Sequence, residues 1–153
     1  SLLDEWERLR DPTYQPAAQA DEATEAVAQN ITTDARRFTA LIRNLMFGML
    51  RAIEYGDYET ISDLAEPGEL KLAVPELQRR IKPFYTDNEH IQLDANARNP
   101  KNLTVEPGSE FWKVTQAILA NDETTEYSLG GRIDIARSIS ERRPVFLLDH
   151  LGA

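Results

Sequence analysis

The sequence predicts an α+β domain in which a long amphipathic helix and shorter helices pack on a curved antiparallel sheet. Two observations lead to this prediction. Apolar residues recur with the period of an α-helix through residues 34–55, whereas the chain after residue 90 alternates with a period of two. Helices that come first and strands that follow are typical of α+β folds.

The stretch 34–55, DARRFTALIRNLMFGMLRAIEY, is the strongest single signal. Thr33 or Asp34 can cap the start of the predicted helix, and Gly56 can end it in a left-handed turn. Its apolar positions form one continuous face, which must be buried by other elements: Phe38, Leu41, Ile42, Leu45, Met46, Met49, Leu50 and Ile53.

Two shorter helices are expected next. The first falls within Asp57–Ala65 and is closed by Pro67-Gly68. Pro75 fits the first turn of the second, in which Leu77, Ile81 and Phe84 share a face. Pro83 is expected to kink or divide that helix.

The remaining chain is predicted to form strands. Ile91–Leu93 alternates and ends at Asp94, and Leu103–Val105 is a short strand. In Glu110–Leu119, Trp112, Val114, Gln116 and Ile118 point one way.

The next period-two run is Tyr127–Ile135, and Gly130-Gly131 within it indicates a bulge or sharp bend. Ser138–Arg143 is expected to be a polar turn, followed by a last strand in Pro144–Leu151.

Length and composition favour one domain at 34–153, preceded by a leading helix and linker at 1–33. The abrupt start, with Leu2, Leu3, Trp6 and Leu9 on one side, indicates a fragment that follows a preceding domain. No apolar run is long enough for a membrane span, so we expect no membrane partner and a cytoplasmic location.

The charge balance is acidic, with 17 basic and 26 acidic residues and a net charge of −9. Nucleic-acid binding normally uses a basic face. The densest basic groups are Arg79, Arg80 and Lys82, and then the segment from Arg137 to Arg143. Either could form a local nucleic-acid patch on an acidic body, although solvated surface is the simpler interpretation.

No catalytic or metal site is predicted. Cysteine is absent, no glycine is followed by lysine as a phosphate-binding loop requires, and His90 and His150 lack metal-ligand spacing. We therefore expect a fragment that is not an enzyme and holds no cofactor.

A ligand pocket is the alternative site hypothesis. If the sheet curls around the long helix, polar and aromatic side chains could line a concave cavity, whereas a solvated sheet face is the simpler outcome. The candidates are Asp94, Arg98, Trp112, Arg132 and Asp134.

The chain resembles an uncharacterised domain at the C-terminus of certain bacterial superfamily 2 DEAD/DEAH-box helicases. The resemblance runs through SLLDEWERLRDP at 1–12, DARRFTALIRNLMFGMLRAIEYGDYETISDL at 34–64, KPFYTDNEHIQLDANARNP at 82–100 and the segment 111–151. The family's Trp-led strand is matched by Trp112, and its strand ending in xxDxAxS is matched by Arg132–Ser138.

The resemblance implies a helicase motor upstream of Ser1, which would use ATP and Mg²⁺ and hold the nucleic acid, with this chain as a non-catalytic accessory domain. Such a domain would dock on the motor, recruit a partner or form a homodimer. The order of elements also looks like the cone of nuclear transport factor 2, which implies a cavity and, as the alternative function, small-ligand binding or catalysis.

Overall fold

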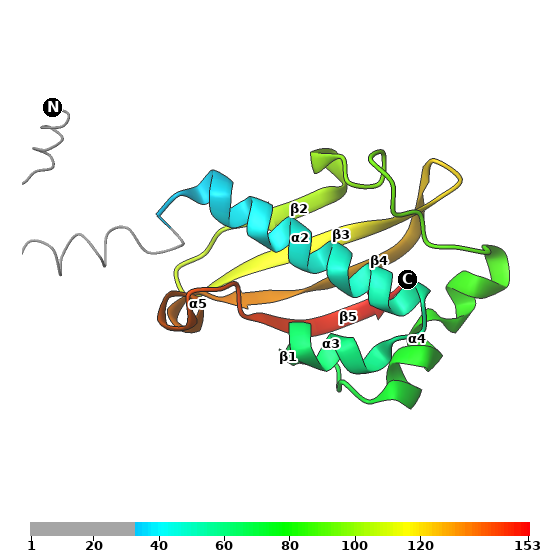
Figure 1. Cartoon of the computed structure of the whole chain (residues 1–153), viewed down its shortest axis with the longest axis horizontal. Helices are drawn as coiled ribbons and strands as arrows, with labels where there is room; N and C mark the ends of the chain where they lie inside the picture. Colours follow the sequence, from blue (N-terminus) through cyan, green and yellow to red (C-terminus); the bar gives the residue numbers. More distant parts are fainter. Residues whose placement is uncertain (1–32) are drawn as a thin grey trace, which may run out of the picture.

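The computed structural model describes residues 33–153 (Figure 1). The predicted leading helix and most of the linker lie outside the described residues. The elements, in chain order, are α2 (Ala35–Glu54), α3 (Tyr58–Leu64), β1 (Glu66–Pro67), α4 (Val74–Asp87), the 3-10 helix η1 (Pro100–Asn102), β2 (Leu103–Glu106), β3 (Phe111–Ala120), β4 (Glu123–Asp134), α5 (Ile135–Glu141) and β5 (Phe146–Gly152).

Helix α2 confirms the strongest prediction. The side chain of Asp34 accepts a hydrogen bond from the Arg37 N–H at 3.1 Å and caps the helix, and Gly56 follows its end with φ of 75°. Most of the predicted stripe is buried, with Ile42 and Met46 fully removed from solvent, but Leu41 is exposed at its edge and Leu45 is half-buried. Helix α2 therefore supplies one wall of the core.

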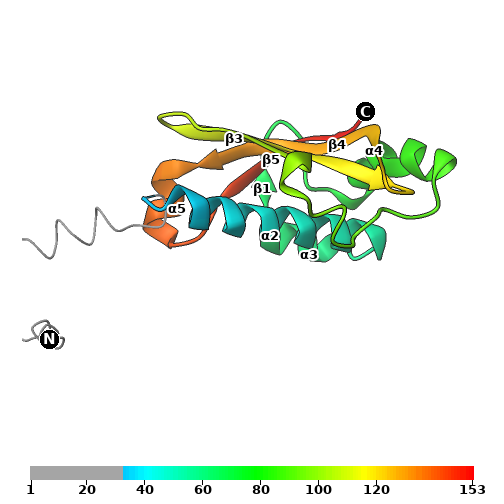
Figure 2. The ribbon, with the colours of Figure 1, turned by 90° about the horizontal axis from the view of Figure 1, so that it is seen from above.

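The sheet has the strand order β1-β5-β4-β3-β2. Strands β2 to β5 are antiparallel neighbours, as predicted, but β1 pairs in parallel with β5 and makes the sheet mixed. Helices α2 and α3 lie together on one side of the sheet (Figure 2). The fold is therefore α+β with a helical layer against one sheet face.

Strand β3 follows the predicted alternation. Val114, Gln116 and Ile118 are buried beneath the helices, while Lys113 is exposed on the opposite face. Trp112 packs edge-on against Phe38 of α2, with ring centroids 5.1 Å apart. These contacts fix which side of β3 meets the helix.

The predicted irregularity at Gly130-Gly131 is confirmed, because the register between β4 and β5 shifts there. Gly130 pairs with His150 and Gly131 pairs with Leu148, so Asp149 is an extra residue on β5. This bulge turns the Asp149 side chain toward Arg132 of β4.

Segment 135–143 corrects the predicted turn at Ser138–Arg143, because Ile135–Glu141 forms helix α5. Asp134 caps this helix by accepting a hydrogen bond from the Arg137 N–H at 3.1 Å, and Arg137 reaches Glu141 one turn later. The cap also ends β4 at Asp134, so Ile135 belongs to the helix instead of the strand.

The strand predicted at Ile91–Leu93 is wrong, and of the two outcomes predicted for Pro83 the division of the helix does not occur. Ile91–Leu93 forms no strand; Gln92 donates one backbone hydrogen bond to Leu119, but no ladder follows. Pro83 does not divide α4, which continues to Asp87, because the burial of Leu77 and Phe84 holds the helix together across the proline.

Burial of α2 predicts a contrast between two neighbouring leucine-sized residues. Ile42→Ala should lower the free energy of unfolding by about 2–5 kcal/mol, because a fully buried side chain leaves a cavity. Leu41→Ala should cost less than about 1 kcal/mol, because Leu41 is 36% exposed. Urea denaturation of both variants measures this, and equal losses would contradict the packing.

Candidate functional site

The face of the sheet opposite α2, which we call the outer face, is uncovered by helices in residues 33–153 (Figure 2). An open groove of about 700 Å³ crosses it. Its floor and walls come from β2 to β5 and the segment after β1. The residues that line it include Glu69, Glu106, Phe111, Lys113, Thr115, Gly130, Arg132, Asp149 and His150.

A fixed ion pair stands on one side of this groove. Arg132 donates two hydrogen bonds to the Asp149 carboxylate, Nε to Oδ2 at 2.7 Å and Nη2 to Oδ1 at 3.0 Å. The Glu69 N–H donates to the same carboxylate at 2.8 Å. The Arg132 guanidinium also lies 5.2 Å from the centre of the Phe111 ring. Arg132 is therefore held from two directions.

This pairing shifts both pKa values in the direction that favours the charged forms. Partial burial alone would raise the pKa of Asp149, but the hydrogen bonds from Arg132 and the Glu69 N–H, with the Arg132 charge, bring it below its ordinary value. The hydrogen bond to Asp149 raises the pKa of Arg132 despite its partial burial. The pair is charged at neutral pH.

Lys113 places a second cation next to Arg132. The two residues are register partners on β3 and β4, and Lys113 is exposed with no ion pair within the described part of the chain. Glu106 is the partner of Lys113 on β2, but no salt bridge joins them. The middle of the groove therefore holds two cations, of which Arg132 is balanced by Asp149 and Lys113 has no ion pair within residues 33–153.

The two glycines of β4 play different roles. A Cβ on Gly131 would clash with the Leu147 carbonyl oxygen and lie 2.7 Å from Cζ of Phe146, so the neighbouring strand and the core require glycine there. A Cβ on Gly130 would meet only ordinary contacts, at 3.4 Å from the Val114 carbonyl oxygen and 3.6 Å from Oγ1 of Thr115. Gly130 is thus not demanded by the fold, and its missing side chain helps to hollow the groove.

The five residues predicted for a ligand pocket do not share one cavity. Arg132 lines the groove on the outer face, whereas Trp112 packs on Phe38 beneath the sheet. Asp134 caps α5. The register pairs Trp112 with Ile133, so Trp112 and Arg132 occupy opposite faces.

Asp94 and Arg98 lie in the irregular segment before η1. Asp94 accepts hydrogen bonds from Gln92 Nε2 and the Ala97 N–H, which lower its pKa. It borders an acidic hollow of about 520 Å³ near the β3–β4 turn. Arg98 lies over the Phe47 ring and donates to Asn44, so it covers the flank of α2.

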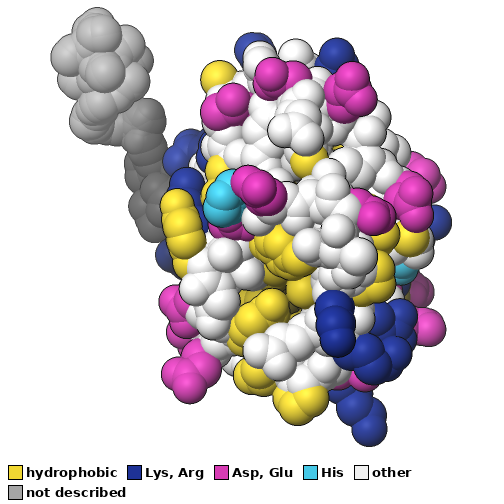
Figure 3. Space-filling model, turned by 90° about the vertical axis from the view of Figure 1, so that its right-hand side faces the viewer, with side chains coloured by type: hydrophobic (Ala, Val, Ile, Leu, Met, Phe, Trp, Pro, Cys, Tyr) yellow, Lys and Arg dark blue, Asp and Glu magenta, His cyan; other side chains and the backbone are white. Residues whose placement is uncertain are grey.

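The predicted basic patch lies on α4. Lys and Arg side chains gather at the lower right of the end view, and others lie at its left edge and top, with acidic side chains scattered between them (Figure 3). Arg79 and Arg80 both pair with Glu76, at 2.6 and 2.9 Å, while Lys82 is exposed. Two of the three predicted cations are therefore shared with an acidic neighbour.

A polar cluster that the sequence did not reveal joins the end of α2 to the last turn of α4 and the segment that follows it. Glu54 Oε1 accepts hydrogen bonds from the Tyr85 hydroxyl at 2.6 Å and the Ile91 N–H at 2.9 Å, and Oε2 lies 2.6 Å from Nδ1 of His90. Burial, followed by the hydrogen bond to Glu54, raises the pKa of Tyr85. The cluster fastens two segments far apart in the chain.

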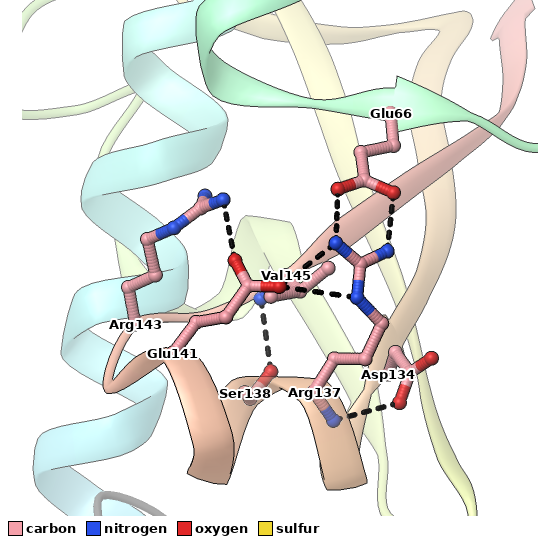
Figure 4. A network of polar contacts seen from close by, with 7 residues as sticks. All are labelled: Glu66, Asp134, Arg137, Ser138, Glu141, Arg143 and Val145. Carbon is pink, nitrogen blue, oxygen red and sulfur yellow. Dashed lines mark hydrogen bonds and ion pairs between the residues drawn. The ribbon is translucent and has the colours of Figure 1, made fainter.

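A second network ties α5 to the edge strand β1 (Figure 4). Arg137 forms a bidentate pair with Glu66 and also binds Glu141, which Arg143 contacts at 2.7 Å. The hydrogen bond from Arg137 lowers the pKa of Glu66. Arg137 and Arg143, named as candidate cations, therefore hold structure together.

No three His, Cys, Asp or Glu side chains within residues 33–153 are placed to hold a metal ion. In the same residues, no helix combines the length and the apolar character needed to cross a membrane.

The fold and the groove define the class of protein: an α+β domain whose sheet, in its described part, bears helices on one face and an open groove on the other. The chain belongs to the family described as "Domain of unknown function (DUF3516)", which matches residues 1–150. No curated protein and no solved structure matched the chain.

The contrast between the glycines gives a stability prediction. Gly131→Ala should lower the free energy of unfolding by about 1–3 kcal/mol or more, because its methyl group meets the Leu147 carbonyl oxygen and the Phe146 ring. Gly130→Ala should change it by no more than about 0.5 kcal/mol, because the methyl group has room. Chemical denaturation tests this, and a larger loss for Gly130→Ala would show that the fold requires that glycine.

The Asp149 pair gives a pH prediction. The pKa of Asp149 is lower in the folded state than its ordinary value of 3.8, so the ionised carboxylate stabilises the folded protein above pH 3.8. This stabilisation is lost as the pH falls through the folded-state pKa. Asp149→Asn should be destabilised at pH 7 and should approach the wild type below pH 3.8. Thermal melts across this range measure the effect. A constant difference would contradict it, and Asp63→Asn, exposed on α3, is the control.

Proposed function

We propose that this domain is a non-catalytic interaction domain that docks a partner through the outer face of its sheet. The observation that carries the proposal is the open groove of about 700 Å³ on a face without helices in the described chain. A sheet face that is hollowed and lined with an exposed aromatic ring is a typical binding surface.

The groove combines an apolar contact with polar groups that are held in place. Phe111 is 36% exposed, and Arg132 is fixed between that ring and Asp149. Pre-ordered side chains lose little conformational entropy on binding. This rigidity supports recognition of a partner.

The engagement of the acid–base groups supports a non-catalytic role. Both carboxylate oxygens of Glu54 already have partners, and Tyr85 donates its hydroxyl to one of them. In the groove, Nε2 of His150 lies 2.9 Å from the Gly152 carbonyl oxygen. General acid–base catalysis needs such groups within reach of a substrate proton, whereas these groups hold the chain together.

We further propose that the domain is the C-terminal accessory domain of a bacterial superfamily 2 helicase and works in the cytoplasm. The sequence resemblance supports this context. In this proposal the upstream motor uses ATP and Mg²⁺ and holds the nucleic acid, and the outer face contacts the motor, a second copy or a recruited protein. The net charge of −9 supports a protein partner over direct nucleic-acid contact.

Site-specific photo-crosslinking in the full-length protein tests the docking surface. Phe111 would be replaced by p-benzoylphenylalanine, and Tyr55, a 73% exposed aromatic at the end of α2, would be replaced in the same way as the control. We expect a discrete crosslinked product from position 111 that position 55 does not give. Mass spectrometry of the joined peptides would then identify the docked segment.

Two results would contradict the proposal. One is the absence of any product from position 111, and the other is the same set of products from both positions. A product that maps to motor domains supports the helicase context, and one that maps elsewhere argues against docking on the motor.

A further inference from the structure

We infer that the groove recognises an extended peptide by a single acidic side chain, which binds between Lys113 and Arg132, with an adjacent apolar side chain over Gly130 and Phe111. This inference rests on the proposed interaction function and specifies its partner. It follows from the donor groups in the middle of the groove, the shape of the groove and the acidic residues at its two sides, Glu106 and Glu69.

Two free donor groups in the middle of the groove suit a carboxylate. Lys113 and Arg132 are direct neighbours on β3 and β4. Asp149 occupies Nε and Nη2 of Arg132, which leaves Nη1 to donate to a ligand. The ammonium group of Lys113, which has no ion pair among residues 33–153, supplies a second donor. Two adjacent donors, one of them a fixed guanidinium, suit a carboxylate.

The bulge in β5 helps to fix the orientation of the Arg132 side chain. The extra residue Asp149 aims its carboxylate across the sheet, and the Glu69 N–H holds that carboxylate in turn. Phe111 packs against the guanidinium from the other direction. The arginine therefore needs no reordering to bind an anion.

Gly130 gives the peptide a place to lie. Its register partners are Thr115 and His150, so a residue without a side chain stands between two residues that have one. Because the fold leaves room for a methyl group at this position, the glycine is explained better by what approaches it from outside. A peptide backbone or an apolar side chain can pack directly against the β4 backbone at Gly130.

The extent of the groove fits a short extended segment. It crosses from Glu106 on β2 to His150 on β5, which is three strand spacings of about 4.8 Å. That distance accommodates roughly four residues of extended chain at about 3.3 Å each. The groove is open to solvent, so a longer chain can continue beyond both ends.

The ends of the groove limit the charge of the partner. Glu106 stands at one side and Glu69 at the other. They repel further acidic residues and favour neutral or basic residues on either side of the central acid. We therefore expect one acidic residue with basic flanks, and we do not expect a polyacidic peptide or a nucleic-acid strand.

A positional peptide library tests the inference. Eight-residue peptides would carry Asp or Glu, Asn or Gln, or Lys or Arg at a central position, with the other positions randomised, and binding to the full chain would be measured by fluorescence polarisation. We expect the acidic-centre pool to bind at least tenfold more tightly than the amide-centre pool. Within it, basic flanks should strengthen binding and acidic flanks should weaken it.

Variants of the groove make the test specific. Lys113→Glu should weaken the acidic-centre pool at least tenfold and shift the preference toward basic centres, because it reverses one of the two charges. Gly130→Ala should weaken binding severalfold while the protein keeps its stability. Lys71→Glu removes an equally exposed lysine outside the groove lining and should change nothing.

The inference would be overturned by equal binding of the three pools, by no binding, by a preference that Lys113→Glu leaves intact, or by displacement of the peptides by oligo-uridine. These failures are separable from failure of the proposed function. A discrete crosslink from position 111 would persist if a partner docks by other chemistry, whereas loss of both signals would remove the interaction function itself.

Discussion

The burial of one apolar stripe of α2 against one face of the sheet is the constraint on which the rest of the structure depends. Ile42 and Met46 have no exposed surface, and Trp112 closes the contact at one end by packing against Phe38. Each strand has two faces, so burying Val114 in this core turns Lys113 and Thr115 outward. The packing of α2 thereby determines which side chains of the sheet lie on the outer face.

Periodicity predicted most of this architecture because the long elements repeat their pattern over several turns or residue pairs. Helix α2 and strand β3 lie close to their predicted bounds, whereas β4 begins at Glu123, before the predicted start at Tyr127. Helix α5 was missed because seven residues show little periodicity, and its start depends on a hydrogen bond from the Arg137 N–H to Asp134. The pairing of β1 with β5 joins residues about 80 positions apart, which no local pattern indicates.

The site was less predictable, because it depends on strand register. Arg132 and Trp112 were grouped in one predicted pocket, but the register of β3 and β4 places them on opposite faces of the sheet. The partner of Arg132 is Asp149, whose orientation comes from a bulge. Gly130 and Gly131 look equivalent in the sequence. Only the surrounding atoms show that packing requires glycine at position 131 and leaves room for a methyl group at position 130.

The acidic total of the chain is compatible with a carboxylate bound by Lys113 and Arg132, because recognition depends on donor groups within a few ångströms and long-range attraction depends on the whole surface. A net charge of −9 disfavours a polyanion that must approach over a wide area. It does not prevent one carboxylate from reaching Lys113 and Arg132, since the rest of the peptide can be neutral or basic. In this proposal the acidic surface disfavours nucleic acid, and the partner is a peptide segment that carries one acidic residue between basic neighbours.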